Sequence, residues 1–224
     1  MSSMFDRTKI VCNNLDKIKN LNICVCGIGG VGSYVVEGLV RSGVTNLTII
    51  DDDVIDITNK NRQLFALDST IGIKKVDVAY NRVRDINRDV NITKIDKKIT
   101  VDDVLINDSF DYVVDCIDDI NAKIALIKFC YIHNIKIISC MGMGNRIHPE
   151  LIEITDIYKT SNCPLARKVR GILKKENINK LLVVYSKELP LKSSVIGSTS
   201  YVPSVAGLYI VSEIINENNS LNKG

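Results

Sequence analysis

The fold of this chain is decided by the stretch Ile23-Cys24-Val25-Cys26-Gly27-Ile28-Gly29-Gly30-Val31-Gly32. Four apolar residues lead directly into the glycines, and from Val31 onward apolar residues recur three and four positions apart. This pattern predicts a strand, a tight turn and a helix. Glycines permit positive φ and let a phosphate approach the backbone, while the N–H groups at a helix start attract anions. We therefore expect nucleotide contacts at Gly27, Gly29, Gly30 and Gly32.

A second strand is predicted at residues 47–50, and it ends at Asp51. A nucleotide-binding fold places an acid at this point, on the ribose hydroxyls, about 20 residues after the glycines. The alternative is that the glycine turn only packs a helix against a strand. In that case Asp51 is an ordinary acid at a strand end.

Length and composition describe an ordinary globular protein. The 224 residues are 46% hydrophobic and 25% charged, with a net charge of +3 that neither demands nor excludes an anionic partner. Seven cysteines lie mostly in apolar runs, which favours a reducing compartment over a disulfide scaffold. We expect one domain over residues 1–224, with a core at about 8–145 and a substrate-side extension at about 146–217.

No targeting or membrane-spanning segment is predicted. The amino terminus lacks the apolar stretch of a signal peptide. The apolar run 202–215 contains polar residues and falls short of the roughly 20 residues needed to span a bilayer. We expect a cytoplasmic protein, and a peripheral membrane contact through this last helix stays open.

Strands and helices alternate along the rest of the chain. Strands are predicted at 90–95, 112–116 and 135–141, and helices at 73–86 and 122–133. After Gly144 we expect a strand at 150–155, a basic helix at 164–175, a strand at 181–185, a polar loop at 193–200 and a closing helix at 205–215. This alternation indicates a Rossmann-like α/β fold, a mostly parallel sheet with helices on both faces. Ligands in such folds bind beyond the carboxyl ends of the strands, where Gly27, Asp51, Asp118 and Gly142 fall.

Several polar residues near these strand ends are candidates for nucleotide chemistry. The guanidinium of Arg62, between Asn61 and Gln63, can bind phosphate oxygens through two parallel hydrogen bonds. The alternative is that Arg62 forms an ion pair at the surface. Lys75 offers a compact positive charge, unless it is solvated as most lysines are. Asp118 offers a ligand for Mg²⁺ bound to the nucleotide, unless it is the N-cap of the following helix. Asp53 belongs to the acidic run 51–53. This run is either part of the nucleotide site or a solvated loop.

With these residues in view, the region from Gly27 to Asp118 resembles the adenylating fold shared by ubiquitin-activating enzymes and the bacterial enzymes that activate sulfur-carrier proteins. The resemblance implies that the glycine turn and the acids after the second strand hold ATP, and that Asp118 binds magnesium. It implies phosphate contacts by an arginine and a lysine. Carried over by position, the ATP-binding and catalytic set is Gly27, Gly29, Gly30, Gly32, Asp51, Asp53, Asn61, Arg62, Gln63, Lys75 and Asp118. In this superfamily an arginine near the amino end enters the neighbouring subunit's site, which implies a homodimer with Arg7 in that role.

The second half of the chain is similar to one branch of this superfamily, the tRNA threonylcarbamoyladenosine dehydratases. The motifs that carry the similarity are residues 141–145, 156–167, 184–186 and 197–203. The branch implies that ATP adenylates the carboxylate of the modification and that an internal attack expels AMP, with net loss of water. The implied partner is tRNA carrying threonylcarbamoyladenosine, and a sulfur-transfer protein stays open as a further partner. A structural zinc is not expected, because the only close cysteine pair, Cys24 and Cys26, shares one face of a buried strand.

A basic region supplies candidates for the tRNA surface. The residues that we expect to contact tRNA are Lys159, Arg167, Lys168, Arg170 and Lys174. A solvated helix face is the competing explanation. Cys163 lies in a predicted loop, which makes it the one cysteine for which we consider exposure, although a structural thiol is the preferred interpretation.

Three other functions remain open on sequence alone. The first is adenylation of a ubiquitin-like or sulfur-carrier C-terminus, which pyrophosphate exchange dependent on such a carrier would favour. The second is a nicotinamide-dependent oxidoreductase, which leaves Arg62, Lys75 and Asp118 without a role. The third is a non-catalytic RNA-binding or scaffold protein that kept the fold.

Overall fold

The structure is a computed structural model that describes residues 3–219, and within them the strands form one seven-stranded sheet. The strand order is β3-β2-β1-β4-β5-β7-β6. Six strands are parallel: β1 (Asn22–Cys26), β2 (Asn46–Ile50), β3 (Asn91–Ile95), β4 (Tyr112–Asp115), β5 (Lys136–Cys140) and β7 (Leu182–Ser186). The last, β6 (Ile152–Asp156), is antiparallel to β7. The mostly parallel α/β sheet is confirmed, and the division into a core and an extension stays a prediction.

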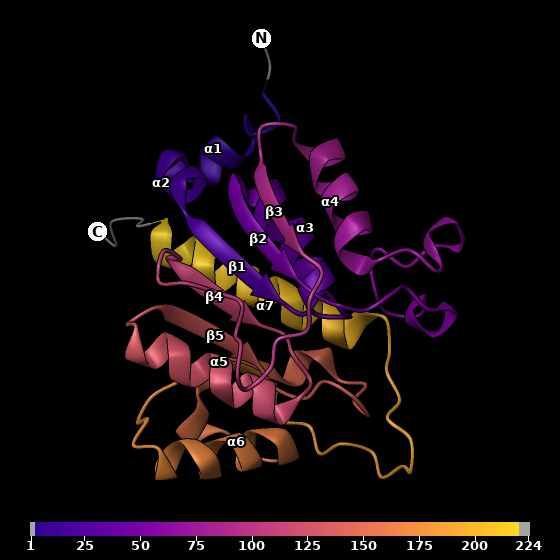
Figure 1. Cartoon of the computed structure of the whole chain (residues 1–224), viewed down its shortest axis with the longest axis vertical. Helices are drawn as coiled ribbons and strands as arrows, with labels where there is room; N and C mark the ends of the chain where they lie inside the picture. Colours follow the sequence, from indigo (N-terminus) through magenta and orange to yellow (C-terminus); the bar gives the residue numbers. More distant parts are fainter. Residues whose placement is uncertain (1–2, 220–224) are drawn as a thin grey trace.

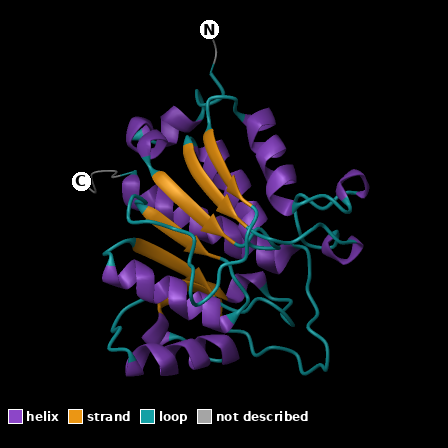
Figure 2. Cartoon of the chain, in the orientation of Figure 1, coloured by secondary structure: helices purple, strands orange, loops and turns teal. Residues whose placement is uncertain are grey.

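Helices cover both faces of this sheet (Figure 1). The near side carries α5 (Ile120–Ile132) and α6 (Pro164–Lys175), and the far side carries α3 (Gly32–Ser42), α4 (Lys75–Ile86) and α7 (Tyr201–Asn218). Two short helices, α1 (Thr8–Val11) and α2 (Leu15–Asn20), precede β1, and single 3₁₀ turns lie at η1 (Ile57–Asn59), η2 (Asp68–Thr70), η3 (Pro149–Leu151) and η4 (Ile157–Lys159). Long connections pass in front of the strands and to one side of them (Figure 2). None of the described helices is both long and apolar enough to cross a membrane.

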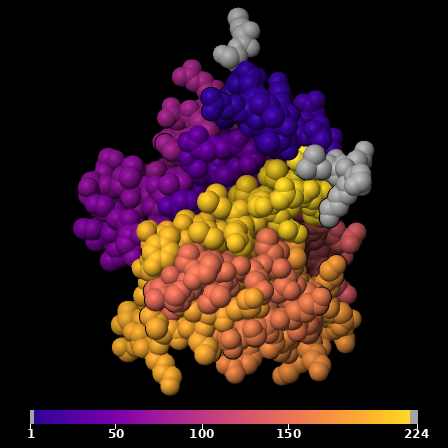
Figure 3. Space-filling model, turned by 180° about the vertical axis from the view of Figure 1, so that it is seen from behind, coloured from indigo at the N-terminus to yellow at the C-terminus, as the bar shows by residue number. Residues whose placement is uncertain are grey.

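The closing helix is longer than the sequence pattern predicted. It begins at Tyr201 and includes Pro203, because proline is tolerated in the first turn, where its missing N–H has no intrahelical partner. From behind, α7 lies across the middle of the molecule, between the N-terminal half and the region after β5 (Figure 3). At Gly207 a Cβ would stand 2.6 Å from the carbonyl oxygen of Val31, so a side chain there would prevent this close packing on the start of α3.

The topology places the functional edge of the sheet. From β1 the chain moves outward to β2 and β3, then returns to the other side of β1 to form β4 and β5. The switch point therefore lies between β1 and β4, where the crevice beyond the strand ends binds ligands in doubly wound sheets. Residues 23–26 of β1 are fully buried, so the central strand is a rigid support for the turn that follows it.

Candidate active site

The glycine turn after β1 is built for close backbone contacts. Gly27 has φ +86°, and a Cβ there would stand 2.8 Å from the carbonyl oxygen of Cys116, the residue that follows β4. A Cβ on Gly32 would stand 1.9 Å from the carbonyl oxygen of Gly27. Side chains are excluded at both positions, and the turn leads directly into α3. The N-terminal end of α3 therefore lies at the switch point. The free N–H groups of a helix N-terminus can bind an anion at such a position.

Asp51 is fixed against this turn. Its Oδ2 accepts the N–H of Ile28 at 2.6 Å, and its Oδ1 accepts the N–H of Asp53 at 2.9 Å. Only 7% of the side chain is exposed. Burial raises the pKa of Asp51, while Lys75 and the two backbone N–H groups oppose the shift. Asp51 is therefore fixed to the glycine turn, and its contact with ribose hydroxyls stays a prediction.

Lys75 is held beside the same acids. Its Nζ lies 2.6 Å from Asp53 Oδ2 and 3.8 Å from Asp51 Oδ1, and 7% of the lysine side chain is exposed. The alternative that Lys75 is solvated is therefore wrong. Asp53 is 64% exposed, so an incoming phosphate can compete with it for the ammonium group.

The segment after η1 brings an arginine and two amides to the glycine turn. Arg62 Nη1 donates to Thr58 O at 3.0 Å and to Asn61 Oδ1 at 2.8 Å, and among the described residues no carboxylate pairs with it. The surface ion pair is therefore wrong. A Cβ on Gly30 would stand 3.3 Å from Arg62 Cγ, which places this side chain against the turn. Gln63 is buried, and its Nε2 lies 3.9 Å from the position of a Cβ on Gly29.

Asp118 lies on the other side of the turn, in the connection from β4 to α5. It is exposed, and its carboxylate has no hydrogen bond or ion pair with any residue from 3 to 219. The alternative that Asp118 is the helix N-cap is wrong, because Asp119 Oδ1 accepts the N–H of Ala122 at 2.9 Å in that role. Asp118 is thus free to bind a ligand.

A buried ionic cluster beneath this connection was not foreseen from sequence. Lys123 Nζ lies 2.7 Å from Asp115 Oδ2, 3.0 Å from Cys140 O and 3.3 Å from Ser139 Oγ, and both charged side chains are fully buried. Asp115 Oδ1 also accepts the N–H of Ile117, the residue before Asp118. The cluster joins the ends of β4 and β5. Its sequence signal was weak, because Lys123 is one of two lysines in the mostly apolar stretch of α5 and nothing in the sequence marks it as the buried one.

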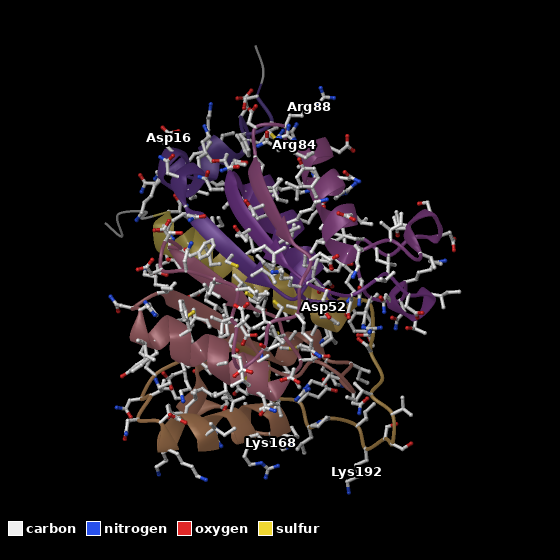
Figure 4. The ribbon with its side chains drawn as sticks, in the orientation of Figure 1. Asp16, Asp52, Arg84, Arg88, Lys168 and Lys192 are labelled. Atoms are coloured by element: carbon white, nitrogen blue, oxygen red, sulfur yellow. The ribbon has the colours of Figure 1, made fainter. Side chains whose placement is uncertain are left out.

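Arg7 is not near the site of its own chain. It is the exposed N-cap of α1, and α1 lies beyond the end of the sheet at which the strands begin (Figure 1). The remaining ATP-binding candidates gather at the opposite end, where Asp52 marks the ends of the strands (Figure 4).

The expected tRNA-binding residues divide into two groups. Lys159, Arg167, Lys168 and Lys174 are exposed. Arg170 is half-buried, and its Nη1 donates to Ile157 O at 3.3 Å and to Thr160 O at 3.0 Å. This guanidinium holds η4 against α6, and its contact with tRNA stays a prediction like that of the four exposed residues.

Cys163 is a structural thiol. It is 4% exposed, and its Sγ accepts the N–H of Ala166 at 3.5 Å as the N-cap of α6. Exposure of this thiol is therefore excluded, and the preferred interpretation is confirmed. The paired thiols of Cys24 and Cys26 lie 3.7 Å apart inside the core, on one face of β1 as predicted.

Known proteins are similar to this chain in sequence and in architecture. The sequence model described as the ThiF family matches residues 6–217. A tRNA threonylcarbamoyladenosine dehydratase of Bacillus subtilis is 37% identical over 239 residues, which cover 96% of this chain and 94% of that protein. Its counterpart from Haemophilus influenzae is 43% identical over 166 residues, covering 73% and 64% of the two chains. The crystal structure of Escherichia coli tRNA N6-threonylcarbamoyladenosine dehydratase in complex with ATP matches with a TM-score of 0.86 and 34% identity, over 92% of this chain and 88% of that one.

Proposed function

The chain belongs to the ThiF family, and on this premise we propose that it catalyses the ATP-dependent dehydration of threonylcarbamoyladenosine in tRNA. The observation that carries this proposal is the similarity, over nearly the full length of both chains, to the Bacillus subtilis dehydratase. The arrangement of Asp51, Arg62 and Lys75 around the glycine turn agrees with it, because an ATP-using enzyme must hold phosphates at this position.

The reaction activates a poor electrophile. A carboxylate oxygen of the threonylcarbamoyl group attacks the α-phosphorus of ATP, and pyrophosphate leaves. A nitrogen or oxygen of the same modification then attacks the acyl carbon, which closes a ring, and AMP leaves with the carboxylate oxygen while the nucleophile loses its proton. The net change in the nucleoside is the loss of one water. Because all reactants are anionic, positioning and charge neutralisation supply most of the acceleration.

The residues of the site fit a nucleoside triphosphate. The glycine turn leaves backbone N–H groups where side chains are excluded, and we assign Asp51, which is fixed against this turn, to the ribose hydroxyls. Arg62 and Lys75 neutralise phosphate oxygens and draw electron density from the α-phosphorus as pyrophosphate departs. Asn61 Oδ1 accepts a hydrogen bond from Arg62, and Gln63 lies buried beside Gly29.

Magnesium bound with the nucleotide fits Asp118. The carboxylate of Asp118 is exposed and unpaired within the described residues, and hard cations such as Mg²⁺ prefer oxygen ligands. When bound, the ion neutralises phosphate charge. Asp118 itself supplies one oxygen ligand at the end of β4.

Partners follow from the chemistry. We assign the outer tRNA surface to Lys159, Arg167, Lys168 and Lys174, whose charges suit a phosphate backbone. We also propose a homodimer in which Arg7, which lies away from the site of its own chain, enters the site of the second copy as the resemblance implies. The location proposed is the cytoplasm, and a sulfur-transfer protein is a further candidate partner.

The test is direct. The protein is incubated with ATP, magnesium and tRNA carrying threonylcarbamoyladenosine. The tRNA is then digested to nucleosides, and their masses are measured by mass spectrometry. We expect loss of one water from the modified nucleoside, with AMP and pyrophosphate in equal amounts. Pyrophosphate exchange that requires a small carrier protein would favour carrier activation instead. Tight NADH binding without ATP binding would favour an oxidoreductase.

A further inference from the structure

The connection from β7 to α7, residues 187–200, contacts the segment that carries Arg62 at one side of the site; we refer to this connection as the site loop. Asn61 Nδ2 donates to Ser198 O at 3.1 Å. From the other side, the N–H of Asn145 donates to Gly197 O at 2.9 Å, and Asn145 Oδ1 accepts the N–H of Gly197. The N–H of Leu191 donates to Asn145 O at 2.8 Å. The loop is therefore fixed both to the arginine segment and to the connection that follows β5.

Between and beside these anchors the site loop exposes aliphatic side chains. The exposed fractions are 69% for Leu189, 57% for Leu191, 73% for Val195 and 81% for Ile196. Ile147, which follows the Asn145 anchor by two residues, is 44% exposed. Single exposed aliphatic residues are ordinary, but a group of them beside a functional site indicates a surface that another molecule covers.

The exposed charges of the site loop are positive. Its one acid, Glu188, is buried and accepts the N–H groups of Ile147 and His148. Lys187 pairs with Glu153 at 2.6 Å, whereas Lys192 is exposed and has no ion pair among the described residues. Lys192 lies at the same end of the molecule as Lys168, away from Arg84 and Arg88 (Figure 4).

We propose that the site loop is the surface that receives the unpaired nucleotides on either side of the modified adenosine. This inference rests on the proposed function and extends it to the mode of substrate recognition. The threonylcarbamoyl group must reach the strand ends, so the adjoining nucleotides lie beside the site. Unpaired bases present apolar faces that pack on apolar side chains, and their phosphates suit an unpaired lysine. The aliphatic group binds the bases, and Lys192 binds the backbone.

Two variants of the site loop test whether this surface binds tRNA without affecting the chemical step. The double variant Val195→Ser, Ile196→Ser and the single variant Lys192→Glu are compared with the wild-type protein. We expect the KM for modified tRNA to rise about fivefold or more in the double variant, with kcat and the dissociation constant for ATP unchanged. Lys192→Glu is expected to raise the same KM. The slope of log KM against log salt concentration should fall by about the amount that one phosphate contact contributes.

Matched controls lie elsewhere on the molecule. Ile132→Ser removes a side chain that is 73% exposed at the end of α5, and Arg88→Glu reverses an exposed charge at the opposite end of the molecule. Both controls should leave the KM for tRNA unchanged. The inference is overturned if the site-loop variants keep the wild-type KM for tRNA. It is also overturned if they alter oligomeric state in sedimentation, since the surface then binds a second copy. A wild-type protein that removes no water refutes the proposed function instead.

Discussion

Replacing Lys123 with methionine should destabilise the protein strongly, because it leaves a buried carboxylate without its counter-charge. The ammonium group lies 2.7 Å from Asp115 Oδ2, and neither side chain is exposed. Methionine keeps most of the apolar stem, so the lost interaction is mainly electrostatic. Breaking one partner of a buried ion pair costs about 3–5 kcal/mol. For a domain of this size the melting temperature should fall by about 6–20 °C.

The assay is equilibrium unfolding in urea at pH 7, followed by circular dichroism, with Lys128→Met as the matched control. Lys128 is on the same helix and pairs with Glu176 at 2.9 Å, but both side chains are 40% exposed. The control should lose less than about 1 kcal/mol. The double variant Asp115→Asn, Lys123→Met removes both charges and should recover part of the loss.

Two results would refute this reasoning. One is a loss below about 1 kcal/mol in Lys123→Met, which would mean that water or a neighbouring group compensates Asp115. The other is a double variant less stable than the single one, which would mean that the carboxylate is needed for its hydrogen bonds to Ile117 and Ser139 more than it is harmed by isolation.

Three further predictions concern the site and the core. Gly32→Ala should abolish ATP binding in a titration and lower the melting temperature, because its Cβ would stand 1.9 Å from Gly27 O. Asp118→Ala should remove ATP-dependent turnover while changing the free energy of unfolding by no more than about 0.5 kcal/mol, since this side chain is exposed; full activity would exclude it as the magnesium ligand. Burial raises the pKa of Cys130 and of Cys140 to about 12, whereas unfolded thiols ionise near pH 8.5. Between about pH 9 and 12 the unfolded state therefore holds fewer protons than the folded state, and urea unfolding should show stability falling as pH rises through this window.

Local sequence patterns determined most of the architecture. The apolar run before Gly27 could only be a buried strand, and the bounds of the helix at 164–175 agree with those of α6 because proline begins it and its apolar face is regular. Asp51 was placed correctly for the same reason: its position depends on the strand that it ends.

Tertiary structure decided how side chains from distant segments meet. Periodicity along one segment says which face is buried but not what it packs against. Only the folded chain places Arg62 beside Gly30, pairs Asp115 with Lys123 in the core and assigns Arg170 to η4. Only residues 193–200 of the site loop were foreseen as a polar loop, and only the anchors at Asn61 and Asn145 reveal that its aliphatic residues stand exposed at the site. These contacts join residues far apart in the chain, and no local propensity encodes them.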